Sequence, residues 1–236
     1  ESILSWQGVF VRLARDADVI ALDLPGFGLS SKPASGYTAD SMASVVSAFL
    51  DRLRLRRVVL VGHSLGGVVA TAMAVRNPER VLGLVLVDPA LVTPWALADT
   101  SDSSRTGASV RRLIAEYELL RDRFSSVHDG NWMAEDSEAA AYQPSSDPAY
   151  AFALTAILRE FDFAFLVPEG ARRLTMPVKL IWGALDPVIP VQTGYALAGR
   201  LPDASLVVLP RTWHRPQTER PTEVARILTV FVRAVH

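Results

Sequence analysis

Short, mostly apolar stretches recur towards both ends of the chain. They lie at residues 18–22, 57–61, 81–87, 178–182 and 205–209. Their brevity and their content of Val, Ile and Leu predict buried β-strands. Between them, apolar positions repeat at helical spacing over residues 38–53, 67–74 and 223–235. Strands that are apolar on both faces and alternate with helices predict an α/β fold with a doubly wound, mostly parallel sheet.

The pattern changes in the middle of the chain, where strand-like stretches stop. Helical periodicity appears at residues 110–120 and 149–165, flanked by polar, glycine-containing loops. We therefore expect residues 1–91 and 176–236 to form the α/β core and residues 92–175 to form a helical lid. An ordinary run of core helices is the alternative. The lid side chains that are candidates for substrate contact are Trp95, Trp132, Met133, Phe161 and Phe165, although side chains at helical spacing more often belong to a core.

Composition narrows the functional classes. The chain has 236 residues, half of them hydrophobic, and a net charge of −1, which gives no reason to expect a nucleic-acid partner. The absence of cysteine excludes disulfides and a cysteine nucleophile, and it leaves the compartment undecided, with the cytoplasm as the default. No apolar stretch approaches the roughly 20 residues of a membrane span. The oligomeric state is not predicted.

A serine stands between a predicted strand and a predicted helix. Residues 62–66 read Gly-His-Ser-Leu-Gly, after the strand of residues 57–61 and before the helix of residues 67–74. Small residues around Ser64 allow the strand and the helix to join in a tight turn that exposes the hydroxyl. In this context the pattern indicates a nucleophile elbow.

A serine nucleophile needs a general base, and that base needs an acid partner. Asp186 follows the predicted strand at residues 178–182, and His214 follows the one at 205–209. Because the carboxyl ends of parallel strands lie at one edge of a sheet, we expect these side chains to meet Ser64 there. The chain order Ser, Asp, His is the one expected for this elbow.

Other residues compete for these roles. Asp88 ends the strand at residues 81–87 and is the rival acid, although Asp-Pro also makes a simple strand-ending turn. Among the histidines, His63 lies inside the elbow and is expected to be a packing or polar-edge residue, His128 falls in the expected lid, and His236 is terminal. His214 is therefore the favoured base.

Several motifs together resemble the α/β-hydrolase fold superfamily, in its branch of small, lidded serine hydrolases. Residues 23–30 read Asp-Leu-Pro-Gly-Phe-Gly-Leu-Ser, residues 62–67 match the elbow, and residues 182–186 and 214–221 match the closing segments. The resemblance implies that Ser64 is the nucleophile, Asp186 the acid and His214 the base. It also implies that the backbone N–H of Leu65 is one oxyanion donor.

One part of the family pattern has no counterpart in this chain. The family carries a strand ending in His-Gly shortly before a helix like that at residues 5–10, and the loop after this strand supplies the second oxyanion donor. Without that strand, two long apolar strand edges would remain unpaired. We therefore expect several further strands and the second donor upstream of Glu1, with one strand lying between those of Val19 and Val59.

These observations predict a serine hydrolase that cleaves a small, fairly apolar ester or related carbonyl compound through an acyl-enzyme. Family members that open epoxides or displace halide use aspartate at the position of Ser64, so Ser64 favours acyl chemistry. The same residues suit a C–C bond hydrolase, a perhydrolase or an acyltransferase, and the scaffold also suits a non-catalytic ligand receptor. An arginine-lined pocket would favour carboxylated dienones.

No cofactor is predicted. Residues 26–28 read Gly-Phe-Gly but do not open a helix with the third glycine that dinucleotide binding requires, and no cluster has metal-ligand spacing. The expected partner is a small-molecule substrate alone.

Overall fold

The computed structural model describes residues 2–91, 148–161 and 173–235. Most of the expected lid at residues 92–175 lies outside these ranges, and so do Trp95, Trp132, Met133, Phe165, His128 and His236. The part of the lid that is described contains one helix, α6 (Pro148–Glu160).

A parallel sheet of four strands forms the centre of the described structure. The strands are β1 (Val58–His63), β2 (Val81–Val87), β3 (Val178–Gly183) and β4 (Ala204–Leu209), in the spatial order β1-β2-β3-β4. All three pairings are parallel, with Gly62 opposite Leu86 and Trp182 opposite Val208. Four of the five predicted strands are thereby confirmed.

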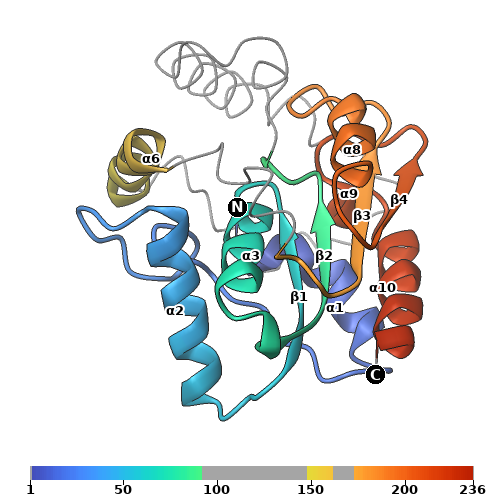
Figure 1. The fold of residues 1–236 in the computed structure, drawn as a ribbon. Helices are drawn as coiled ribbons and strands as arrows, with labels where there is room; N and C mark the ends of the chain where they lie inside the picture. The colour runs from blue at the N-terminus through green and yellow to red at the C-terminus, as the bar shows by residue number, and fades with distance from the viewer. Residues whose placement is uncertain (1, 92–147, 162–172, 236) are drawn as a thin grey trace.

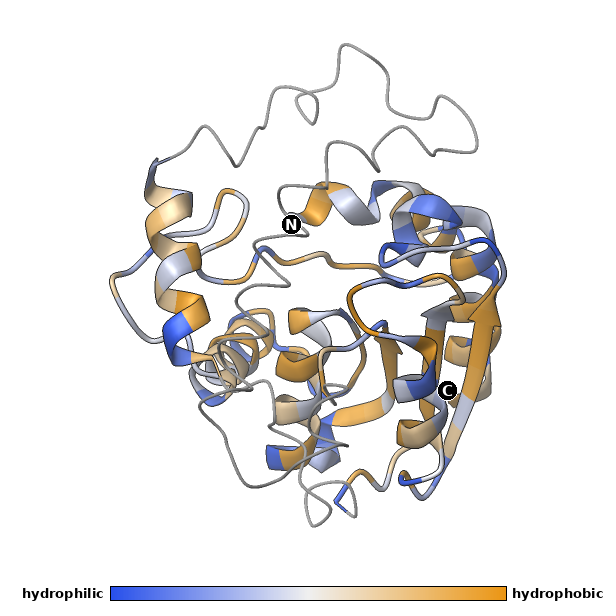
Figure 2. Cartoon of the chain, turned by 90° about the horizontal axis from the view of Figure 1, so that it is seen from above, coloured by the Kyte–Doolittle hydropathy of each residue, from blue (hydrophilic) through white to orange (hydrophobic). Residues whose placement is uncertain are grey.

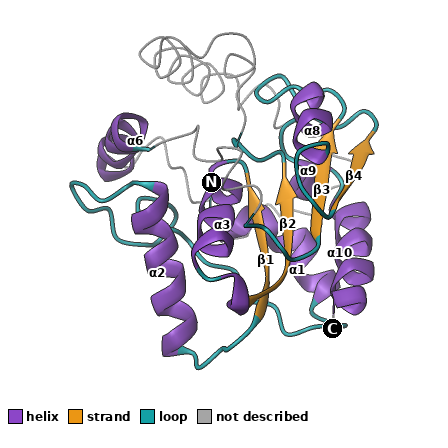
Figure 3. Cartoon of the chain, in the orientation of Figure 1, coloured by secondary structure: helices purple, strands orange, loops and turns teal. Residues whose placement is uncertain are grey.

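Helices cover both faces of this sheet (Figures 1 and 3). In chain order they are η1 (Ile3–Trp6, a 3₁₀ helix), α1 (Gln7–Leu13), α2 (Ala39–Arg52), α3 (Leu65–Arg76), η2 (Pro78–Arg80, a 3₁₀ helix), α6, α8 (Val191–Ala198), α9 (Pro216–Glu219) and α10 (Pro221–Val235). The three predicted helices correspond to α2, α3 and α10. Thr38 caps α2, since its side chain accepts a hydrogen bond from the N–H of Ser41 at 3.1 Å.

The alternation of side chains along the strands divides the core into two apolar clusters. Leu84 and Leu86 of β2 pack on one side, in the cluster that holds the inner faces of α2, α3 and α8. Val85 and Val87 pack on the other side, against α1 and α10. Both faces of β2 are therefore buried, and the strands are predominantly hydrophobic in Figure 2.

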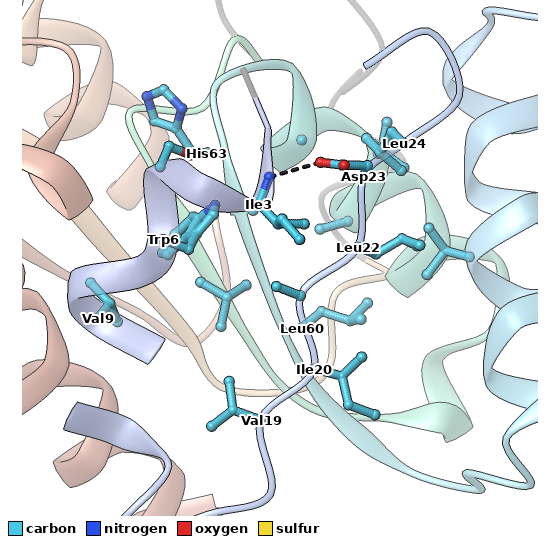
Figure 4. Close-up of a pocket in the computed structure, with 18 of the residues that line it drawn as sticks. Ile3, Trp6, Val9, Val19, Ile20, Leu22, Asp23, Leu24, Leu60 and His63 are labelled. Atoms are coloured by element: carbon cyan, nitrogen blue, oxygen red, sulfur yellow. Dashed lines mark hydrogen bonds between the residues drawn. The ribbon is translucent and has the colours of Figure 1, made fainter. Parts of the chain in front are cut away.

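The predicted strand at residues 18–22 is not present in this structure. Residues 18–24 run alongside β1 without belonging to the sheet (Figure 4), and among the described residues β1 lies at the edge of the sheet and pairs with β2 alone. A cavity of about 870 Å³ separates the two segments, lined by Val19, Leu22 and Leu60 among other apolar side chains (Figure 4). The prediction was wrong here because an apolar stretch becomes a strand only when a neighbouring strand accepts and donates its backbone hydrogen bonds.

Asp23 fixes the end of this unpaired segment. Its Oδ1 accepts from the N–H of Ile3 at 2.7 Å, and its Oδ2 accepts from the N–H of Leu29 at 3.0 Å. The segment is therefore held at its carboxyl end, while Ile20 remains 52% exposed. The expectation of a further strand between Val19 and Val59 stays a prediction.

Candidate active site

Ser64 occupies a sharp turn between β1 and α3. Its backbone lies at φ 49° and ψ −118°, a left-handed conformation that is strained for a residue with a Cβ. The N–H of Ser64 donates to the carbonyl of Val87 at 3.0 Å, and its own carbonyl accepts from the N–H of Gly67 at 3.0 Å. A Cβ on Gly62 would collide with the backbone of Gly66. The turn therefore presents the hydroxyl at the carboxyl end of the sheet.

His214 links Ser64 to Asp186. Its Nε2 lies 3.1 Å from the Ser64 Oγ, and its Nδ1 lies 2.7 Å from the Asp186 Oδ2. The side chains of His214 and Asp186 are buried. The structure thus brings together the three side chains that the sequence placed after three different strands.

Backbone groups hold the Asp186 carboxylate in place. Its Oδ1 accepts from the N–H groups of Val188 at 2.7 Å and Ile189 at 3.0 Å. The loop that carries Asp186 is tied to the loop that carries His214, because the N–H of Leu185 donates to the carbonyl of Thr212 at 2.8 Å. The distance between Asp186 and His214 is therefore fixed by hydrogen bonds on both loops.

Two side chains outside the predicted set hold the His214 loop. Glu219 accepts from the N–H of Trp213 at 2.7 Å and from the N–H of Arg215 at 3.0 Å, on either side of the histidine. His63 Nε2 lies 2.6 Å from the backbone oxygen of His214, so the His63 ring acts as a donor. From the sequence, Glu219 is expected only as part of a family motif within residues 214–221, and His63 as a packing or polar-edge residue. The sequence feature that could have indicated a role for His63 is its position directly before Ser64.

Comparisons with known proteins identify the family of this chain. A family model described as "alpha/beta hydrolase fold" matches residues 1–221. The chain belongs to the α/β-hydrolase fold family. Relatives with named activities are hydrolases, and this chain is therefore a hydrolase as well.

Three relatives illustrate the likeness. The uncharacterized hydrolase YugF of Bacillus subtilis is 29% identical over 98% of this chain and 86% of its own length. The 2-hydroxymuconate semialdehyde hydrolase of Pseudomonas sp. (strain CF600) is 31% identical over 97% of this chain and 81% of its own length. The solved structure of an esterase from Thermogutta terrifontis is 25% identical and superposes with a TM-score of 0.72, covering 100% of this chain and 86% of the esterase.

Asp88, the rival acid of this α/β-hydrolase, lies at the carboxyl end of β2 and is fully buried. Its Oδ1 accepts from the N–H of Gly183 at 3.0 Å, at the end of β3. Asp186, and not Asp88, accepts the hydrogen bond from His214 Nδ1, and Asp88 instead joins the ends of two neighbouring strands.

One group of metal-ligating side chains meets in the described part of this hydrolase. Ring nitrogens of His63 and His214 and a carboxylate oxygen of Asp88 lie within 4.8 Å of one another. Both ring nitrogens of His214 already contact Asp186 and Ser64, so a cation there would have to displace one of them. The arrangement suits proton transfer between Ser64 and His214 better than metal binding.

The large cavity beside β1 extends to Ser64 and His214. Side chains of α6, among them Tyr150 and Ile157, also line it. Phe161, one of the candidates for substrate contact, takes the core alternative: it is buried in the larger apolar cluster and is not among the residues that line this cavity. Within the described ranges, none of the helices is both long and apolar enough to span a bilayer.

Glu160 connects α6 to the core. Its Oε2 accepts from the N–H groups of Gly36 at 2.8 Å and Tyr37 at 3.0 Å. These hydrogen bonds, foremost that from Tyr37, together with the neighbouring Arg159, lower the pKa of the Glu160 carboxyl. One end of the helix that borders the cavity is thereby held by a charged hydrogen-bond acceptor.

Proposed function

We propose that this hydrolase cleaves a small, fairly apolar ester or related carbonyl compound through a covalent acyl-enzyme on Ser64. The observation that carries the proposal is the position of His214, whose ring nitrogens contact the Ser64 hydroxyl at 3.1 Å and the Asp186 carboxylate at 2.7 Å. Serine is a weak nucleophile unless a base removes its proton, and this geometry supplies the base.

In the proposed first step, His214 Nε2 takes the proton from Ser64 Oγ as the oxygen attacks the substrate carbonyl. Asp186 accepts from Nδ1–H, keeps the proton off Nε2 in the resting state and stabilises the imidazolium that forms. The imidazolium then gives its proton to the departing alcohol, leaving the acyl group on Ser64.

In the proposed second step, water attacks the acyl-enzyme with His214 again acting as base, and the carboxylic acid leaves. Leu65 begins α3 and directly follows Ser64, and its N–H belongs to the helical first turn, which has no intrahelical acceptor. We assign this N–H to the negative oxygen of the tetrahedral intermediate. One such donor is worth about 10²–10³-fold in turnover.

The mainly apolar lining of the cavity next to Ser64 supports an apolar substrate. Leu24, Phe27 and Leu65 line it beside the serine, together with Tyr150 and Ile157. Burial of apolar substrate surface against such walls contributes about 25 cal/mol per Å².

C–C bond hydrolysis is the second candidate, and the relationship to the 2-hydroxymuconate semialdehyde hydrolase of Pseudomonas favours it. The same three residues would serve, with a carbanion-like carbon rather than an alcohol as the leaving group. Perhydrolysis and acyl transfer would differ only in the molecule that attacks the acyl-enzyme. A ligand receptor on this scaffold would bind without reaction at Ser64.

A substrate panel with a serine variant tests the proposal. We expect the protein to hydrolyse p-nitrophenyl acetate and butyrate, and Ser64→Ala to lower kcat by at least about 10⁴-fold. Ser205→Ala, at an exposed serine of β4, is the matched control and should keep full activity. Circular dichroism should show the same fold in all three proteins.

Two results would favour a different function for this hydrolase. Preferential turnover of a dienone carboxylate over the esters would favour the C–C hydrolase. Failure of a fluorophosphonate probe to label Ser64 in the folded protein would leave the receptor as the better description.

A further inference from the structure

Asp88 is a buried acidic side chain that the proposed mechanism does not use. It ends β2 in a left-handed conformation, with φ 40°, and its N–H donates to the carbonyl of Ile181 at 3.0 Å. Its Oδ1 accepts from the N–H of Gly183 at 3.0 Å. A strained backbone held by two hydrogen bonds to β3 indicates that this carboxyl has a defined position.

The second oxygen of Asp88 lies in a different environment. Oδ2 is buried and meets no hydrogen-bond donor within the described residues. The titratable groups that face Asp88 are Asp186, His214, His63 of β1 and Glu219 of α9. An ionised carboxylate there would place an unpaired negative oxygen next to two other carboxylates.

Burial is the largest reason why the pKa of Asp88 is raised well above its usual range. The charges of Asp186 and Glu219 and a side-chain hydrogen bond with Asp186 raise it further, while the Gly183 N–H lowers it. Two carboxyl groups that share a site cannot both ionise without a large cost, so one keeps its proton. Asp186 accepts three hydrogen bonds, from the N–H groups of Val188 and Ile189 and from His214, whereas within the described residues Asp88 accepts one, from Gly183, so we place the proton on Asp88.

We propose that Asp88 is a positioning residue, a neutral carboxylic acid that accepts from Gly183 through Oδ1 and donates its Oδ2 proton to the carboxylate of Asp186. Asp186 has room for this donor, because its Oδ1 accepts from two N–H groups and its Oδ2 from His214. The inference rests on the proposed role of Asp186 as the acid partner of His214.

The competing interpretation is that Asp88 is ionised and acts as a second acid partner of His214. A ring nitrogen of His214 lies within 4.8 Å of a carboxylate oxygen of Asp88. The two interpretations differ in the effect of removing the charge alone. Asparagine at position 88 keeps an acceptor for Gly183 and offers an N–H donor to Asp186, but it is never charged.

The test compares Asp88→Asn with Asp88→Ala in the ester assay across pH. We expect Asp88→Asn to keep kcat close to the parent and to leave the acid limb of the pH profile in place. We expect Asp88→Ala to lower kcat by roughly 10-fold to 100-fold, because Gly183 and Asp186 each lose a buried partner. Asp203→Asn, at an exposed aspartate before β4, is the matched control.

The opposite pattern overturns the proposal. If Asp88 carried a negative charge beside His214, removing that charge would shift the acid limb of the pH profile of Asp88→Asn relative to the parent. Substantial activity in Asp186→Asn that disappears in the Asp186→Asn, Asp88→Asn double variant would likewise identify Asp88 as an acid. Both outcomes can be measured even if Asp88→Ala fails to fold.

A measurement without turnover separates this inference from the proposed function. The infrared carbonyl band of a protonated carboxyl should be present in the parent at neutral pH and absent in Asp88→Asn. Its absence from the parent overturns the inference even if the ester assay succeeds. If Ser64 proves unreactive while the band is present, the proposed function fails and only the neutral state of Asp88 remains.

Discussion

The ring of His63 lies 2.6 Å from the backbone oxygen of His214, and the two imidazole centroids are 4.9 Å apart. The residue that precedes Ser64 therefore holds the loop that carries the proposed base. Positions far apart in the chain are joined here by one hydrogen bond, in addition to the contact between Ser64 and His214.

Replacing His63 should affect both stability and turnover. In His63→Ala the buried carbonyl of His214 loses its donor, which costs about 1–3 kcal/mol, and the imidazole of His214 becomes less well positioned. We expect a lower melting temperature and a lower kcat. His63→Gln, whose amide can donate, should recover much of both. Equal losses in the two variants would argue that ring packing, rather than the hydrogen bond, is what matters.

The two glycines of the elbow motif should differ in their tolerance of a side chain. A Cβ on Gly62 would collide with the backbone of Gly66, whereas a Cβ on Gly66 would meet nothing within 4 Å. We expect Gly62→Ala to destabilise the protein by about 1–3 kcal/mol through overpacking and to reduce activity. Gly66→Ala, in the first turn of α3, should unfold at the same or a higher denaturant concentration. Urea titrations of both variants check the pair, and a destabilised Gly66→Ala would contradict the expectation.

Glu160 should make the attachment of α6 sensitive to acid. Because the folded pKa of Glu160 is lowered, its contribution is complete above the ordinary glutamate pKa and is lost as pH falls through the folded value. We expect hydrogen exchange over Pro148–Glu160 to accelerate on acidification, after correction for the intrinsic rate. Glu160→Gln should show faster exchange already at neutral pH. Glu79→Gln, at an exposed glutamate of η2, is the control and should exchange like the parent.

Dye binding in the cavity between residues 18–24 and β1 offers a test of the predicted extra strand. We expect the 236-residue chain to bind the dye 8-anilinonaphthalene-1-sulfonate there, because Val19, Ile20 and Leu22 line an apolar space next to an unpaired strand edge. A form of the protein carrying a strand in that place should bind little dye and should protect the amides of residues 19–22 from exchange. Unchanged exchange at residues 19–22 in such a form would contradict the prediction.

Much of the fold followed from local pattern. The stretches that became β1, β2, β3 and β4 are short, apolar and rich in Val, Ile and Leu, which burial on both faces of a parallel sheet requires. Residues 18–22 share that composition but form no strand here. Composition specifies that a segment suits a sheet, whereas pairing depends on which segment lies beside it.

The chemistry of the site followed from chain order. The positions of Ser64, Asp186 and His214 after β1, β3 and β4 predicted that they would meet, because parallel strands end at a common edge. The bonds that hold them were not predictable in this way. His63 and Asp88 act through backbone groups of segments distant in the chain, and no spacing rule links a side chain to a remote carbonyl or N–H. Glu219 acts on two N–H groups of its own segment, beside His214.

The sequence by itself determined the layered α/β architecture and the three side chains that converge at its edge, since both depend on periodicity and on strand direction. Only the tertiary structure decided what the carboxyl of Asp88 contacts, which histidine holds the His214 loop, and that residues 18–22 form no strand. These outcomes depend on the distances between segments remote in sequence, and such distances are set by the packing of the whole core rather than by any local pattern.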